Sequence, residues 1–165
     1  HGATSSDNRI TWLNDIAVDS YGDVLVAGTA IQTGLSERQE EAVFVKFSPT
    51  GERLWVGKAA LQRADNDGSA RFFDDTRALV ADNQGNLYSI AITQRTTDDS
   101  TTFSSHLVSF NRNGKQRWTR KLSDQEDMRA LALNDDQVVV AGLSTQRFSL
   151  TGNKLSHVDH PEHSA

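Results

Sequence analysis

The chain has 165 residues, of which 36% are hydrophobic and 7% aromatic, a composition that supplies the core of one folded domain. Its 17 basic and 22 acidic residues give a net charge of −5, which argues against a general nucleic-acid binder and against binding to anionic membrane surfaces. The absence of cysteine excludes disulfides, thiolate metal sites and cysteine nucleophiles, and no apolar run is long enough for a membrane-spanning helix.

The first part of the chain reads as short strands joined by tight turns, without the 3.6-residue period of a helix. Three apolar strands are expected first, at residues 16–18, 24–28 and 43–47. A fourth strand then carries Trp55. Gly22 and Gly51 lie in the two connecting turns, where a tight hairpin needs a residue with positive φ.

The same pattern recurs along the chain. Residues 16–28 align with 79–91, and 45–55 align with 108–118, both at an offset of 63. A shorter third copy occupies 131–142 and 148–155. The sequence therefore predicts three repeat units and a tail, at residues 10–60, 74–122, 127–157 and 158–165. Their matched structural residues are Gly22, Gly85, Gly51, Gly114, Gly152, Trp55 and Trp118.

Four-stranded antiparallel units in series are typical of the blades of a β-propeller, so we predict an all-β fold of this kind. A β-sandwich is the competing architecture, but it gives no reason for glycine and tryptophan to recur at matched places. Closed propellers have about 4–8 blades, and three units are too few. We therefore expect a segment of a larger propeller, or a ring closed by another chain.

The segment Phe-Val-Lys-Phe-Ser-Pro-Thr-Gly-Glu-Arg-Leu-Trp, at 44–55, follows an Asp-x-x-Gly-Asp turn and an apolar strand. This combination resembles the SBBP-type β-propeller repeats of bacterial secreted and surface proteins. It is also similar to the tryptophan-docking segment of quinoprotein-type propellers, in which a Thr-Gly turn precedes a tryptophan that packs between blades. The resemblance covers about 10–155 and implies a scaffold in a periplasmic, secreted or cell-surface protein. The third copy departs from the pattern, because Gln137 replaces the hairpin glycine and no tryptophan follows Leu155.

Tight turns and long connections are expected at opposite ends of such units. The long segments are 29–42, 60–76 and 93–106. Long loops in compact domains are often functional, so we predict that ligand or partner contacts lie on this long-loop face. The alternative is that these segments are solvated decoration.

Two matched motifs precede the innermost strands of the second and third units. Asp75-Thr-Arg77 and Asp127-Met-Arg129 repeat at an offset of 52, and Asn14 holds the corresponding position in the first unit. Both arginines are expected to face the mouth of the central channel, where a guanidinium can bind a carboxylate or phosphate. The alternative is an Asp–Arg ion pair that links neighbouring blades.

Metal binding has weaker support. Asp65 and Asp67 with the following glycine form a calcium candidate, but the third acidic position and the distant glutamate of an EF-hand loop are missing. His157, His160 and His163 have a spacing that could hold zinc, or they belong to a frayed tail. A solvated loop is the better interpretation of Asp65 and Asp67, so we expect no cofactor, with calcium as the remaining candidate.

The chain contains no Gly-x-Ser-x-Gly motif and no cysteine nucleophile. We therefore favour a non-catalytic scaffold or binding module, whose partner is the rest of a larger propeller or another chain. The alternative is the partial propeller of an enzyme, quinoprotein-like or hydrolase-associated, whose catalytic residues lie outside this chain.

Overall fold

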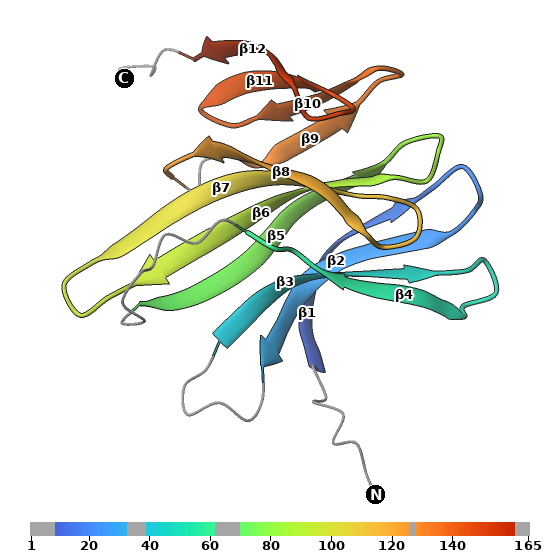
Figure 1. Ribbon diagram of the computed structural model, residues 1–165, viewed down its shortest axis with the longest axis horizontal. Coiled ribbons are helices and arrows are strands. Elements are labelled where there is room, and N and C mark those ends of the chain that lie inside the picture. The colour runs from blue at the N-terminus through green and yellow to red at the C-terminus, as the bar shows by residue number, and fades with distance from the viewer. Residues whose placement is uncertain (1–8, 33–38, 62–69, 126–127, 161–165) are drawn as a thin grey trace, which may run out of the picture.

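The computed structural model describes residues 9–32, 39–61, 70–125 and 128–160 (Figure 1). These ranges contain β-strands and no helix, which confirms the prediction of an all-β fold. The strands are β1 (Arg9–Val18), β2 (Val24–Gln32), β3 (Gln39–Phe47), β4 (Arg53–Lys58), β5 (Arg71–Ala81), β6 (Leu87–Thr96), β7 (Thr101–Phe110), β8 (Gln116–Ser123), β9 (Ala130–Leu133), β10 (Gln137–Ala141), β11 (Ser144–Ser149) and β12 (Lys154–Asp159).

The strands form three antiparallel units of four. In each unit, every strand pairs with the next one along the chain: β1–β4 form the first unit, β5–β8 the second and β9–β12 the third. One parallel pair, Glu40 with Phe73, joins β3 to β5, so that β1–β8 make one eight-stranded sheet and β9–β12 a separate sheet. Figure 1 shows the three units stacked in chain order.

The first apolar layer lies between the first and second units. Leu25 and Phe44 of the first unit are buried there against Leu87 and Phe110 of the second. The Phe44 and Phe110 ring centroids are 5.0 Å apart. Because side chains alternate along a strand, the residues next to those in this layer face the opposite side of each sheet.

The second apolar layer lies between the second and third units. Tyr88 and Leu107 of the second unit are buried there with Val138 and Phe148 of the third. Strand β6 therefore serves both layers, and its first seven residues are all buried. This explains its mostly apolar sequence, which is typical of a strand covered on both faces.

Each tryptophan of the fourth strand covers a turn glycine of the next unit. The Trp55 indole lies over Gly114, where an added Cβ would come within 2.7 Å of the ring, and its Nε1 donates to the Arg112 carbonyl at 2.8 Å. Trp118 repeats this contact over Gly152, also at 2.7 Å. Both glycines have positive φ, so the turn needs glycine for its backbone conformation as well as for the indole.

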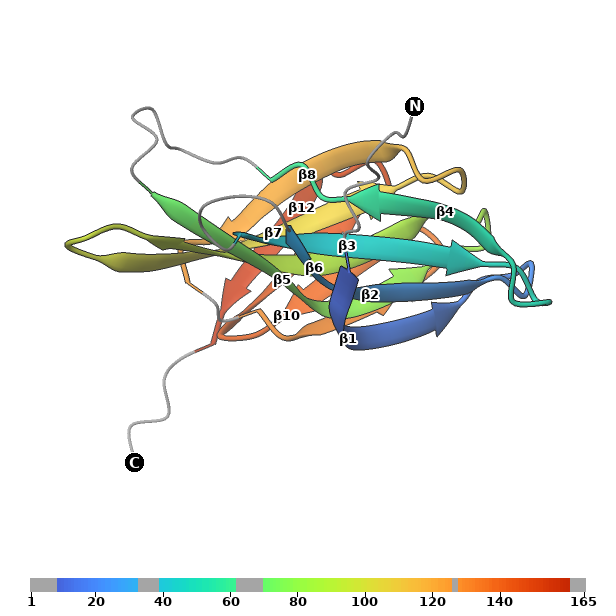
Figure 2. The same cartoon turned by 90° about the horizontal axis from the view of Figure 1, so that it is seen from below.

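Tight turns lie together at one end of the units, and the β6–β7 hairpin points the other way (Figures 1 and 2). The expected loop at 93–106 is wrong, because β6 and β7 continue through it and leave only a turn at 97–100, closed by the Thr97 amide donating to the Ser100 carbonyl at 2.8 Å. Threonine favours β-strands, but nearly all residues of these strand ends are polar, so the sequence indicated a loop there. The expected loops at 29–42 and 60–76 are also partly strand, because β2 runs to Gln32, β3 begins at Gln39 and β5 begins at Arg71. Similarly, β12 extends to Asp159, past the predicted unit boundary at 157.

No helix among the described residues has the length and apolar character needed to cross a membrane.

Candidate functional site

Three residues of the predicted binding set meet at the long-loop end of the first two units. Asp75 Oδ1 accepts hydrogen bonds from the Asn14 side-chain amide, from the Thr29 hydroxyl at 2.7 Å and from the Thr76 backbone amide at 2.8 Å. Its other oxygen faces the Arg77 guanidinium at 3.6 Å. Asn14 and Thr29 belong to the first unit and Asp75 to the second, so this carboxylate links the two units.

Irregularities in the register of β1 and β5 place these side chains. The β1–β2 register shifts between Leu13 and Asp15, and the β5–β6 register shifts between Thr76 and Ala78. Asn14 and Arg77 are therefore the extra residues of two equivalent bulges. A bulge turns its side chain away from the regular alternation, which explains why both point to the same end of the molecule. The offset of 63 that relates Asn14 to Arg77 in the sequence therefore also relates the two bulges in the strand register.

The Asn14, Asp75 and Arg77 cluster lines a pocket of about 210 Å³. Glu40 and Gln94 add a carboxylate and an amide to its wall. The Arg77 side chain is 36% exposed, so solvent reaches the guanidinium. An incoming carboxylate or phosphate would meet Arg77 beside Asp75, and would have to compete with that carboxylate for the guanidinium.

Arg129 lies at a different place. It lines a larger pocket, of about 750 Å³, together with Asp124, Gln125 and the start of β7. Phe103 lines both pockets and lies where they adjoin. The predicted set is therefore divided: Asn14, Asp75 and Arg77 come together, and Arg129 joins the third unit. Asp127 lies outside the described residues.

Of the candidate metal ligands, His157 and His160 lie within the described residues, and they have different partners. Asp65, Asp67 and His163 lie outside the described residues. His157 pairs with Asp159 at 2.8 Å on the exposed strand β12, and His160 contacts the Thr145 hydroxyl at 2.8 Å. Within the described ranges, no three histidine, aspartate or glutamate side chains are close enough to hold a metal ion.

His106 is buried in β7, although its sequence position predicted a polar loop. Its Nε2 lies 2.9 Å from the Ser104 hydroxyl. Burial, followed by the charge of Lys121, lowers the pKa of His106 to about 4, against the opposite effect of Asp124. A histidine with this pKa is neutral at pH 7 and is a weak general base. Among the described residues, its Nδ1 has no hydrogen-bond partner to orient it as in a catalytic triad.

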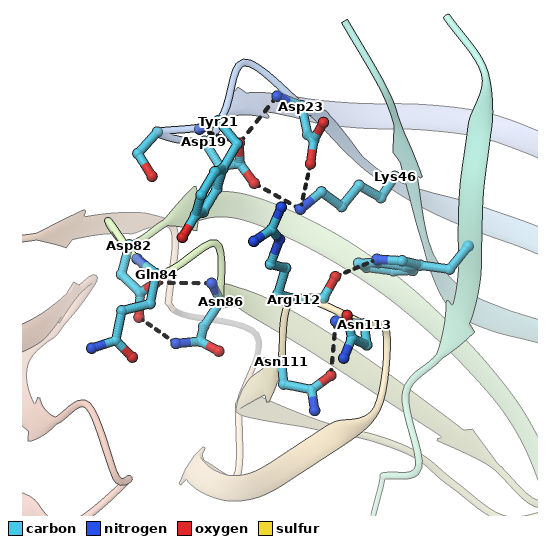
Figure 3. Close-up of polar contacts among 12 residues, drawn as sticks. Asp19, Tyr21, Asp23, Lys46, Asp82, Gln84, Asn86, Asn111, Arg112 and Asn113 are labelled. Carbon is cyan, nitrogen blue, oxygen red and sulfur yellow. Dashed lines mark hydrogen bonds and ion pairs between the residues drawn. The ribbon is translucent and has the colours of Figure 1, made fainter.

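Sequence reasoning missed a charged network at the turn end (Figure 3). The Lys46 ammonium is only 1% exposed and lies 2.7 Å from Asp19 Oδ2 and 2.9 Å from Asp23 Oδ2. Burial raises the pKa of Asp19, but the Lys46 hydrogen bond and the backbone amides of Tyr21 and Asp23 outweigh this effect and leave the pKa below its usual 3.8. A lysine inside the apolar run Val-Phe-Val-Lys-Phe was the signal that would have found it.

Comparison with protein-family models and with curated proteins finds no match to this sequence.

Proposed function

We propose that the chain is a non-catalytic β-propeller segment that serves as a scaffold or binding module. Its three units are the blades, further units complete the ring, and the long-loop face carries the contacts with a ligand or partner. On the repeat resemblance, we place the protein among exported bacterial proteins, in the periplasm, in the medium or at the cell surface.

The way in which the units stack is the observation that carries this proposal. The innermost strands lie next to one another, because β1 contacts β5 and β5 contacts β9. Each junction repeats the same apolar layer and the same Trp-on-glycine contact. Radial repetition of four-stranded sheets around inner strands is the architecture of a propeller. A sandwich of two sheets would not repeat one interface between successive units.

The Asn14, Asp75 and Arg77 cluster is the part of the long-loop face best suited to bind a ligand. Inner strands β1 and β5 carry it, and it opens to solvent through Arg77. A ligand with a carboxylate or phosphate and a neighbouring donor would satisfy both Arg77 and Asp75. The site has charged and polar groups that can bind a ligand, and no activated nucleophile lies beside it among the described residues.

Ring closure is tested by the mass of the native species, measured by light scattering. We expect a mass above the 18.2 kDa of this chain, either from a longer polypeptide or from an assembly. A native monomer of 18.2 kDa would contradict the proposal, because three units would then stand alone.

The ligand site is tested by titrating the protein with acetate and with inorganic phosphate while recording side-chain NMR signals. We expect shifts at Arg77 Nε–H and at the Asn14 amide, and Arg77→Gln should abolish the shift at the Asn14 amide. Arg147→Gln, at an exposed arginine of β11, is the matched control and should leave them unchanged. Titration without a shift at either group would contradict the assignment of this site.

A further inference from the structure

The two filled Trp-on-glycine contacts define a repeated docking geometry. In each, the indole lies over a turn glycine, and its N–H donates to a backbone carbonyl two residues before that glycine. The acceptors are the Arg112 carbonyl, before Gly114, and the Leu150 carbonyl, before Gly152. Both acceptors belong to the turn between the third and fourth strands of the unit that receives the indole.

Gly51 is the third member of this series and is uncovered. Its φ is +85°, against +81° at Gly114, and its amide closes the same turn by donating to the Ser48 carbonyl at 2.9 Å. A Cβ added at Gly51 would meet no atom of the described residues within 4 Å. The Pro49 carbonyl holds the position that accepts the indole N–H in the other two turns.

The face beside Gly51 is apolar. Alternation places Ile16, Val26, Val45 and Val56 on the side of the first unit away from the second, and the strand register aligns them in one row across β1–β4. The two ends of this row are exposed, Ile16 at 63% and Val56 at 50%, whereas Val45 in its middle is buried.

This face matches the one that the second unit already buries. Leu79, Leu87 and Val108 of the second unit lie in the first apolar layer, and the offset of 63 relates them to residues 16, 24 and 45. The outer face of the first unit thus continues the interface that is filled twice elsewhere in the chain.

We propose that this face and Gly51 form a docking surface for one further four-stranded β unit that carries a tryptophan in its fourth strand. The incoming indole covers Gly51 and donates its N–H to the Pro49 carbonyl, and the apolar face of the unit packs on the Ile16 to Val56 row. This inference rests on the proposed propeller and names the chemistry of the unit that extends it.

The third unit of a second copy lacks the side chain that the dock requires. Trp55 lies opposite Lys46 and Trp118 opposite Ser109, and the equivalent position of the third unit is Ser156, opposite Arg147. The occupant is therefore a tryptophan-bearing unit rather than another copy of this chain.

The dock is probed directly with N-acetyl-tryptophanamide, observed through backbone amide NMR shifts. We expect saturable shifts at Gly51 and little change at Gly114, which Trp55 already covers. N-acetyl-phenylalaninamide has the same amide groups but no indole N–H donor, and should shift Gly51 less. Absence of a shift at Gly51, or equal shifts at Gly51 and Gly114, overturns the proposal.

A second test supplies the missing side chain. Ser156→Trp should make copies associate head to tail and raise the mass in solution about twofold or more over the unsubstituted chain. Adding Gly51→Asn should reverse this, because asparagine tolerates positive φ but brings a Cβ into the place of the indole. Gly22→Asn, in a turn that receives no indole, is the control.

Association of Ser156→Trp that survives Gly51→Asn overturns the proposal. So does self-association of the unsubstituted chain that Gly51→Asn abolishes, because the occupant would then be a second copy. A native species above 18.2 kDa that shows neither indole binding nor Gly51 dependence would leave the ring proposal standing and refute only this dock.

Discussion

The turn after the first strand has the same backbone in the first and second units, yet different chemistry stabilises it. Asp19 Oδ1 accepts the amides of Tyr21 and Asp23, and Asp82 Oδ1 accepts the amides two and four residues later in the same way. The two turns therefore present the same demand: the second carboxylate oxygen is buried and needs its own donor.

The first unit meets this demand with charge and the second with neutral groups. Lys46 donates to Asp19 Oδ2 in the first unit. In the second, Asp82 Oδ2 accepts from the Asn86 side chain at 2.8 Å and from the Tyr88 hydroxyl at 3.0 Å. The position equivalent to Lys46 is the small Ser109, which leaves room for the tyrosine. The comparison shows that one buried turn is compatible with an ion pair or a hydrogen-bond network, provided that several positions change together.

The largest effect should come from removing the cation of the first network. Lys46→Met keeps the side-chain length but leaves the Asp19 and Asp23 carboxylates buried together, and we expect a loss of about 3–5 kcal/mol of unfolding free energy. Urea unfolding measures it. The loss should shrink at low pH, because protonation of a carboxylate relieves the repulsion. A loss below about 1 kcal/mol would show that the ion pair contributes no more than an exposed one.

A matched exchange between the units tests whether the two solutions are interchangeable. Asn86→Asp gives the second unit the residue of the first without a lysine, and should cost about 2–3 kcal/mol, because a donor to Asp82 is replaced by a like charge. The reverse exchange, Asp23→Asn, leaves Lys46 paired with Asp19 and should cost about 1 kcal/mol. Both are measured by urea unfolding at pH 7. Equal costs would mean that Lys46 does not distinguish the two turns.

The all-β fold and its tight turns were predictable because their signals are local. Glycine with positive φ and the aspartate that caps the turn act within one hairpin, and Gly22 and Gly85 both have positive φ. The tryptophan recurs at a fixed offset, although it contacts a glycine of the next unit. In the third unit the turn at 134–136 is shorter and contains no residue with positive φ, so no glycine is needed at position 137.

The candidate site was predictable only in part. Asn14, Asp75 and Arg77 meet because bulges occur at equivalent positions, and the offset of 63 carries that information. Arg129 shares the motif but joins another pocket, since its neighbours come from the β6–β7 hairpin and the third unit. The lysine inside an apolar run indicates a buried cation, but the run does not identify Asp19 and Asp23 as its partners, because they come from another hairpin.

The smallest effect concerns the neutral network. Tyr88→Phe leaves Asp82 bonded to Asn86, and leaves Arg117 bonded to the Ser109 hydroxyl at 3.2 Å, so the loss at pH 7 should be about 1 kcal/mol. Its pH dependence is more informative. Burial raises the pKa of Tyr88 to about 12 against the lowering effect of the Arg117 hydrogen bond, whereas an unfolded tyrosine has a pKa of 10.0.

Between these two values the unfolded state loses the Tyr88 proton and the folded state retains it, so the stability that this group contributes falls as the pH rises from 10 to 12. Urea unfolding across this range should show a steeper alkaline loss in the unsubstituted protein than in Tyr88→Phe, and Tyr21→Phe should keep the steep loss. Parallel curves for the unsubstituted protein and Tyr88→Phe would mean that the hydroxyl is already ionised or hydrated in the folded state. The second turn would then rely on Asn86 alone, and the neutral network would be simpler than its geometry indicates.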